Sequence, residues 1–476
     1  MQSVYMRVSD LYEAAMDVRT RRLLEAPIIP TVLRLAAPNV LVMLVQASIG
    51  LIETYFVAAL GTDALAGMAL VFPVVMLIQM ISAGAMGGGI MAAVARALGG
   101  NRRADADALV WHAAAIATAL GLATSVLALT LGPSLYGAMG GRDGSLAAAL
   151  TYSNVVFAGA LFIWLFNSLA AIIRGTGNML FPALVMTIGA VALIPLSPAL
   201  IFGWGPLPRL GIVGGGVALL GYYAIGTAVF AAYLWSGRGV LRASARPPRL
   251  TLALAWAILR VGLVSSLVSF TTNVSIAVAT GFAGAFGPAA VAGYGTGARL
   301  EYLLVPLIFG LGAPIGAMVA TAIGAGDRRR ALRTAWTGAL IAGVLTEAIG
   351  LAAALAPEAW LRLFAEDPTV IATGARYLQI VGPFYGAFGV GLALYFASQG
   401  AGRVGWPLVA GLVRVLVAVG GGWLALRQGG GLDGVFLALG IALAVFPLII
   451  GVAIASGSWF PEPRRSEPVA ALKPGE

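Results

Sequence analysis

Twelve long apolar segments divide this sequence, and they limit its fold more than any other feature. Each segment is bounded by glycine, proline or charged residues. The segments run near 31–60, 64–98, 106–131, 147–173, 179–202, 212–236, 255–286, 289–324, 330–355, 369–397, 404–427 and 433–458. A bilayer requires about 20 apolar residues for one helix, whereas transmembrane strands alternate in polarity over about 10. The pattern therefore predicts an all-α membrane protein with twelve transmembrane helices.

Composition and charge exclude most soluble functions. Charged residues make up 10% of the chain, against about 25% in soluble domains. The net charge of +10 comes almost entirely from arginines, since Lys473 is the only lysine. These arginines concentrate in alternate loops, which places both termini in the cytoplasm and the chain in the cytoplasmic (inner) membrane. We therefore expect a lipid bilayer as partner and no nucleic acid.

Catalytic and redox chemistry lack their usual ligands. Cysteine is absent, and His112 is the only histidine. Thiolate metal sites, disulfides and haem ligation are thus not expected, and we predict no metal, no cofactor and no enzyme activity. His112 lies early in its segment, where packing near the cytoplasmic surface is the expected role.

The two halves of the sequence repeat. Residues 95–99 recur as 320–324, a shift of 225 positions. The same shift relates two turns of the pattern G-x-G-x4-P, formed by Gly175, Gly177 and Pro182 and by Gly400, Gly402 and Pro407. Six spans per repeat is an even number, so both halves insert with the same orientation. Such parallel repeats are typical of transporters with a central site.

The repeat and the charges predict a domain organisation of two six-helix bundles. A basic, proline-containing stretch lies at the midpoint of the chain. The predicted parts are a cytoplasmic N-terminal segment 1–29, an N-terminal lobe 30–236, a cytoplasmic linker 237–254, a C-terminal lobe 255–458 and a cytoplasmic tail 459–476.

Ionisable residues near span ends are assigned to the two membrane faces, and five are assigned to the membrane-embedded part of the predicted spans: Glu53, Arg299, Glu301, Glu347 and Arg414. Each costs about 2.5–3.5 kcal/mol at the centre of a membrane helix, so each is expected to face a cavity or a partner. The acids and Arg414 have no ionisable counterpart in the other half. That asymmetry favours coupling or substrate binding over a role in the common fold. The structural alternative is a buried pair of Glu301 with Arg414, or another polar partner for each, because an unpaired buried charge is strongly unfavourable.

The order of several motifs resembles the multidrug and toxic compound extrusion family over residues 30–458. The resemblance rests on Pro38, residues 52–57 (IETYFV), 60–61 (LG), 64–67 (ALAG) and the turns 98–100 and 324–327. This resemblance implies a secondary antiporter that expels small organic compounds, often cationic, in exchange for protons or sodium. We expect it to act as a monomer.

Departures from the family pattern indicate which residue is the coupling site and which branch of the family the chain resembles. Where the family usually has an Asp-Thr pair, this chain has Glu53-Thr54, so Glu53 is the predicted proton site. Asn273 stands where one branch has a sodium-linked glutamate, and Leu193 and Ser197 replace an Asn and Asp pair of another. The DinF-like branch fits better. Further coupling or cavity candidates are Asn39, Gln46, Asn273, Arg299, Glu301, Glu347 and Arg414.

Three other functions remain as alternatives. Sodium-coupled drug export would use the same fold. A lipid-linked saccharide flippase of the same superfamily would more naturally carry several cations in its cavity, and only Arg299 and Arg414 lie within spans. A membrane enzyme would require a set of catalytic acids, histidines or metal ligands that the sequence does not supply.

Overall fold

The structure is a computed structural model that describes residues 17–460, and over that range it is helical with no strand. The first half contains α2 (Val18–Glu25), α3 (Ile28–Ala58), α4 (Thr62–Gln79), the π-helix η1 (Met80–Met86), α5 (Gly87–Gly99), α6 (Arg103–Ala138), α7 (Asp143–Ala158), α8 (Ala160–Gly175), α9 (Leu180–Phe202) and α10 (Ile212–Trp235). The second half contains α11 (Leu252–Gly284), α12 (Pro288–Gly324), α13 (Arg328–Leu355), α14 (Pro357–Leu361), α15 (Pro368–Val381), η2 (Gly382–Phe384), α16 (Tyr385–Ala401), α17 (Gly405–Arg427) and α18 (Gly431–Ala455).

These helices make the twelve predicted spans. Within residues 17–460, eleven stretches are long and apolar enough to cross a bilayer, and the pair α7–α8 gives the twelfth, bent by 49°. The helices α4, η1 and α5 form one continuous span, and so do α15, η2 and α16. The predicted fold class is confirmed.

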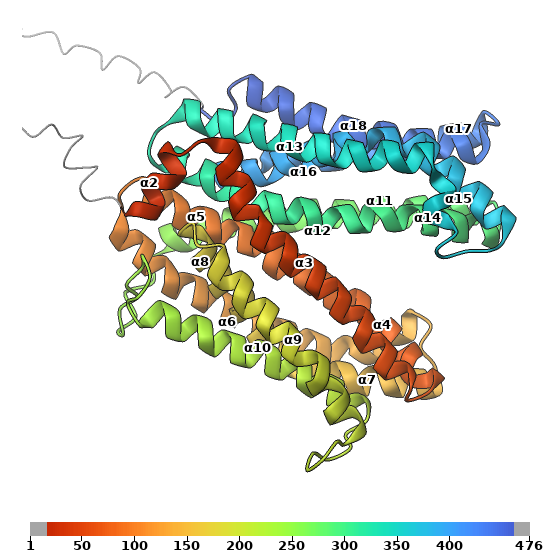
Figure 1. Cartoon of the computed structure of the whole chain (residues 1–476), viewed down its shortest axis with the longest axis horizontal. Coiled ribbons are helices and arrows are strands. Elements are labelled where there is room, and N and C mark those ends of the chain that lie inside the picture. Colours follow the sequence, from red (N-terminus) through yellow and green to blue (C-terminus); the bar gives the residue numbers. More distant parts are fainter. Residues whose placement is uncertain (1–16, 461–476) are drawn as a thin grey trace, which may run out of the picture.

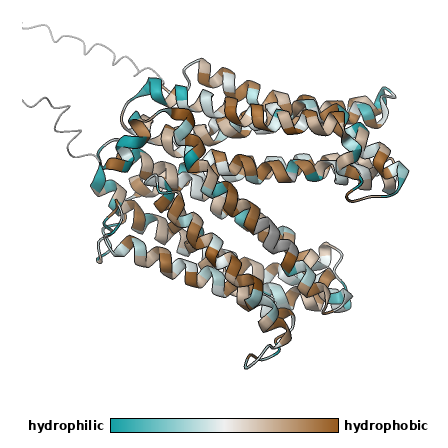
Figure 2. Cartoon of the chain, in the orientation of Figure 1, coloured by the Kyte–Doolittle hydropathy of each residue, from teal (hydrophilic) through white to brown (hydrophobic). Residues whose placement is uncertain are grey.

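The spans form two lobes (Figure 1). Helices α4 to α10 lie in one lobe and α11 to α18 in the other. The lobes meet at the end that carries the α5–α6 turn, the α12–α13 turn and the linker 236–251. We call it the arginine-rich end, because Arg102 and Arg103 flank the first turn and Arg328, Arg329 and Arg330 follow the second. The lobes diverge toward the opposite end. Hydropathy agrees with membrane insertion, because hydrophobic residues cover the helices and hydrophilic ones gather at the ends (Figure 2).

Helix α3 contacts both lobes. Val32 and Ala36, near its start, lie in the hydrophobic core of the second lobe. Val57, near its end, packs with Met68 and Ile201 in the first lobe. The predicted lobe boundary near residue 30 therefore lies at the start of the span α3. This span packs against both lobes.

A reciprocal glycine contact demonstrates the parallel repeat. A Cβ atom added at Gly99 would lie 2.1 Å from the carbonyl oxygen of Thr321, and one added at Gly324 would lie 2.1 Å from that of Arg96. The two contacts interchange when 225 is added to or subtracted from each number. The pseudo-twofold axis thus passes between α5 and α12, where only glycine lets the two backbones approach so closely.

Candidate functional site

Glu53 lies inside the first lobe, with 7% of its surface exposed. Its Oε1 atom is 3.4 Å from the hydroxyl of Tyr152 on α7, a long hydrogen bond in which the tyrosine donates. A Cβ atom at Gly215 on α10 would lie 3.3 Å from the same oxygen, so the carboxyl packs directly over that glycine. Among the described residues, no arginine forms an ion pair with Glu53 or acts electrostatically on it.

A run of three glycines shapes this pocket for the carboxyl. A Cβ atom at Gly214 would lie 2.6 Å from the backbone of Leu200 on α9, and one at Gly216 would lie 3.1 Å from the side chain of Val155 on α7. Larger residues would push α10 away from both neighbours. Small residues at helix contacts in membranes permit this close packing. The sequence of α10 therefore determines how tightly α10 closes over Glu53.

A chain of polar side chains lies in the same lobe and was not predicted from the sequence. The amide of Gln79 donates to the hydroxyl of Tyr223. Asn167 Nδ2 donates to Gln79 Oε1 at 2.7 Å and to Ser82 Oγ at 2.8 Å. Tyr223 lies within electrostatic range of Glu53. Ser82 belongs to the π-helix η1, a deformation that often marks functional sites. The sequence signal that could have revealed this chain is the presence of amide side chains, Gln79 and Asn167, inside otherwise apolar segments.

The two amide candidates earlier on the helix of Glu53 are not shown to contact it. Asn39 is buried, and its Nδ2 atom has no hydrogen-bond partner among the described residues. Fourteen positions of helix separate it from Glu53, which is about 21 Å along the axis. The side chain of Gln46 lies outside the described residues.

Glu301 and Arg414, expected to form a buried pair or each to meet another polar partner, form no direct ion pair among the described residues. Glu301 accepts a hydrogen bond from the hydroxyl of Tyr377. Arg414 is buried, 6% exposed, with its guanidinium 5.6 Å from the ring centre of Phe446. The two charges act on each other only at longer range. The reason is the helix arrangement, since α17 packs chiefly between α11 and α18 rather than against α12.

Glu347 has a structural partner. The backbone N–H of Gly386 donates to its Oε2 atom at 2.6 Å. Gly386 lies in the first turn of α16, whose N–H groups have no acceptor within the helix. The carboxylate thus caps α16 from the neighbouring helix α13, at the break that η2 introduces. A Cβ atom at Gly386 would lie 2.5 Å from the same oxygen, so this cap requires glycine.

The remaining candidates lie on exposed faces. Arg299 is exposed and lies over the ring of Phe364, 5.3 Å from its centre, away from Glu301. Asn273 is exposed, donates to the carbonyl of Ser269 at 3.0 Å, and lies 3.9 Å from the sulfur of Met80 in the other lobe. Asn273 therefore borders the contact between the lobes.

His112 holds the linker, in keeping with the packing role expected for it. Its Nε2 atom accepts from the backbone N–H of Thr251 at 2.8 Å, and its Nδ1 atom is 2.9 Å from the carbonyl oxygen of Ala108. The described residues contain no group of three or more acidic or histidine side chains that could hold a metal ion.

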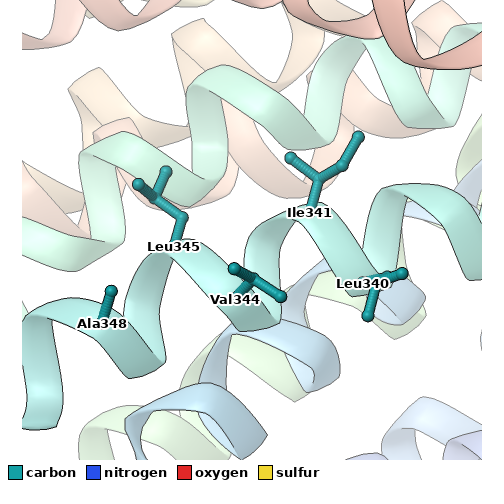
Figure 3. A pocket seen from close by; sticks show the side chains of 5 residues that line it. All are labelled: Leu340, Ile341, Val344, Leu345 and Ala348. Carbon is teal, nitrogen blue, oxygen red and sulfur yellow. The ribbon is translucent and has the colours of Figure 1, made fainter.

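An apolar hollow of about 430 Å³ lies on the outer face of α13 (Figure 3). Its lining consists of Leu340, Ile341, Val344, Leu345 and Ala348. No charged or hydrogen-bonding side chain lines it, so it has the character of a lipid-exposed surface.

Two parallel six-helix lobes that meet at one end, with a buried acid in one of them, define a multi-pass membrane transporter. The model of the MatE family matches residues 38–199 and 265–424. The chain belongs to this family, the multidrug and toxic compound extrusion transporters. It therefore transports small organic compounds as a multidrug exporter and is not an enzyme.

Two curated relatives align over nearly the whole chain. An FAD transporter of Shewanella oneidensis is 27% identical over 94% of this chain and 97% of its own. A probable multidrug resistance protein NorM of Deinococcus radiodurans is 29% identical over 90% and 96%.

Solved structures agree with the fold. An outward-facing multidrug resistance MATE transporter superposes with a TM-score of 0.83 at 25% identity, covering 93% of this chain and 99% of its own. A transporter of the MOP superfamily from Pyrococcus furiosus gives a TM-score of 0.84 at 25% identity over 92% and 97%, and its binding pocket is described as having reverse polarity.

Proposed function

We propose that this protein exports organic cations across the cytoplasmic membrane in exchange for protons, as a monomer, and that Glu53 is the proton-exchange site. The observation that supports this role is that no described residue forms an ion pair with Glu53 to balance its charge. Of the three acids away from the ends of the described spans, Glu301 accepts a hydrogen bond from Tyr377 and has Arg414 at longer range, and Glu347 accepts a backbone N–H at 2.6 Å. Glu53 is buried and has only the distant hydroxyl of Tyr152.

Competition between ligands then follows from the surroundings of Glu53. A lone carboxylate screened from water is stabilised by binding either a proton or a cation. It cannot hold both, so proton entry releases the cationic substrate and lets the neutral site return through the closed state. The membrane potential adds about 2.3 kcal/mol per charge per 100 mV to the driving force. Tyr152 and Gly215 would fix the position of the carboxyl in both steps.

An anionic flavin nucleotide is a second candidate substrate. A relative named as an FAD transporter aligns over almost the full length of both chains. In this chain, the buried cation Arg414 and the exposed Arg299 would attract phosphate groups rather than organic cations. A cationic substrate would bind at a site dominated by Glu53. An anionic substrate would bind at a site dominated by these arginines.

Proteoliposomes provide the test. Efflux of ethidium and of FAD is measured under an imposed proton gradient and, separately, under a sodium gradient. We expect ethidium transport under the proton gradient alone. Glu53→Gln should abolish it and Glu53→Asp should retain it. The control Glu358→Gln removes an acid that is exposed and paired with Arg362 at the far end of the molecule, and it should transport normally.

Each contrary result has a defined meaning. Wild-type ethidium efflux by Glu53→Gln under a proton gradient would refute Glu53 as the coupling site and move the search to Glu301 or Glu347. Transport driven by sodium alone would replace proton coupling. Transport of FAD without ethidium would replace the cationic substrate class.

A further inference from the structure

Arg96 on α5 reaches across the seam between the lobes. Its Nη1 atom donates to the carbonyl oxygen of Gly400 at 2.8 Å and lies 3.4 Å from that of Gln399. Both carbonyls belong to the last turn of α16, in the other lobe. Carbonyls in the last turn of a helix lack donors within the helix and carry its negative dipole end, so a guanidinium there is favourable.

The second G-x-G turn of the repeat forms the binding surface for this arginine. Gly402 has a left-handed backbone with φ of 71°, and a Cβ atom there would lie 3.2 Å from Arg96 Nη1. A Cβ atom at Gly400 would lie 2.3 Å from the carbonyl oxygen of Gly316 on α12. Larger residues would therefore move the α16 carbonyls away from Arg96. The motif found in the sequence thus has a specific occupant in the second half.

Arg96 is held without any acid. It forms no ion pair among the described residues, and the charged groups that act on it are Arg102 and Arg260, both of like sign. Neutral acceptors hold a cation less tightly than a buried carboxylate does. The contact is therefore strong enough to favour closure at this end, yet it can break during a transport cycle.

The contact between Arg96 and the end of α16 has no counterpart in the other half, although the G-x-G turn that forms its binding surface occurs in both halves. Thr321 occupies the position of Arg96 in the repeat, and its hydroxyl donates to the carbonyl of Ala317 within its own helix. In the first half, the matching glycine Gly177 lies 3.0 Å, measured from its added Cβ, from the side chain of Leu23 on α2. The repeat folds at the equivalent place without an arginine, so folding alone does not require Arg96.

We propose that Arg96 is a positioning residue for transport: it holds the lobes together at the arginine-rich end, and its release from the C-terminus of α16 is a required step in opening that end. The reasoning uses the exchange of access that antiport requires, and so rests on the proposed function. Because α5 and α16 belong to different lobes, no opening at this end can leave their hydrogen bonds intact.

Distance measurement tests this directly. The chain contains no cysteine, so Ala104→Cys on α6 and Gly405→Cys on α17 give two exposed spin-label positions in different lobes, near the arginine-rich end. Electron–electron resonance in lipid nanodiscs then reports the distribution of their separation. Arg96→Met should increase the ratio of the long to the short separation by about tenfold or more, the factor expected for hydrogen bonds to a charged group. Arg96→Lys should give an intermediate ratio.

Arg330→Met is the matched control. Arg330 also donates to two carbonyls near a helix C-terminus, those of Leu23 and Ala26 at 2.9 and 2.7 Å. Leu23 and the neighbour Ala331 share the core of the second lobe. The Leu23 side chain also lies beside Gly177 of the first lobe, but the two hydrogen bonds of Arg330 join α13 to the end of α2 and do not cross between the lobes. Their loss should leave the distance ratio unchanged.

The outcomes separate clearly. An Arg96→Met distribution equal to that of the wild type, or an equal shift in Arg330→Met, would overturn the proposal. If Arg96→Met does not fold, the Arg96→Lys and Arg96→Gln distributions decide by the same criterion. The measurement requires neither substrate nor gradient, so failure of Glu53 as the proton site would leave its result valid.

Discussion

The reciprocal contact of Gly99 and Gly324 gives a quantitative prediction. Each glycine faces a backbone carbonyl of the opposite lobe, and a Cβ atom at either position would lie 2.1 Å from that oxygen. Non-bonded carbon and oxygen atoms rarely approach within 3.0 Å. Gly99→Ala or Gly324→Ala must therefore move α5 and α12 apart by roughly 1 Å. The obstructing atoms belong to the backbone, so no change of side-chain rotamer can relieve the overlap.

The expected cost is that of overpacking a buried contact, about 1–3 kcal/mol for either variant. The pseudo-twofold axis makes the two costs similar, although the sequences around them differ. Once one substitution has separated the helices, the second meets less overlap. The double variant should therefore cost less than the sum of the two single variants, as is usual for contacting residues.

Thermal unfolding in detergent, followed by tryptophan fluorescence, provides the assay. Gly420→Ala is the control, because Gly420 lies within α17 with nothing within 4 Å of its added Cβ. Alanine there should leave the unfolding midpoint unchanged or raise it, since alanine is favoured over glycine within a helix by up to about 1 kcal/mol. If Gly99→Ala and Gly324→Ala unfold at the temperature of Gly420→Ala, the close approach of α5 and α12 is incorrect.

Two further predictions concern charges. Glu301→Gln and Arg414→Met should each destabilise the second lobe, and the double variant should lose less stability than their sum by about 0.5–3 kcal/mol in a double-mutant cycle of unfolding, because each single change leaves one charge unbalanced. The N–H of Thr369, at 2.7 Å, and that of Val370 hold the pKa of Asp367 below its ordinary value at the start of α15. A lowered pKa gives stability above the ordinary carboxyl value that is lost as pH falls below about 4. Hydrogen exchange of these amides should therefore accelerate on acidification in the wild type, relative to the intrinsic rate, and much less in Asp367→Asn. Equal acceleration in both would refute that cap.

Much of the fold could be predicted from the sequence because bilayer insertion is a length and polarity requirement. The predicted run at 179–202 corresponds to α9 (Leu180–Phe202), and the run at 404–427 to α17 (Gly405–Arg427). Interruptions within spans were not predicted, since η1 and the 49° bend between α7 and α8 leave apolarity unchanged. Hydropathy is insensitive to backbone hydrogen-bond pattern, which distinguishes a π-helix from an α-helix.

The candidate site was predicted less completely. Glu53 could be singled out because a charge within an apolar run is costly wherever it points. Its partners could not, since Tyr152 and Gly215 lie about 100 and 160 positions away and meet it only in the folded lobe. The lack of a direct contact between Glu301 and Arg414 could not be foreseen for the same reason. Opposite charges in one lobe suggest a pair, but helix order within the bundle decides whether they touch, and α17 packs against α11 and α18.

The repeat distinguishes two kinds of residue. Residues present in both halves maintain the fold, and we assign roles in transport to charged residues present in only one half. A glycine occurs at this position in both halves, as Gly99 and Gly324, because the single crossing of α5 and α12 needs one glycine on each side of the axis. Glu53 and Arg96 occur once, and a fold built from two equal halves has no packing requirement for a charge in only one of them. In a symmetric pair of lobes, opening at one end or the other differs little in packing energy. In the proposed cycle, single charged groups bias that equilibrium, Arg96 through the seam and Glu53 through its bound proton. The proposal therefore places the directionality of transport in residues that have no counterpart in the other half.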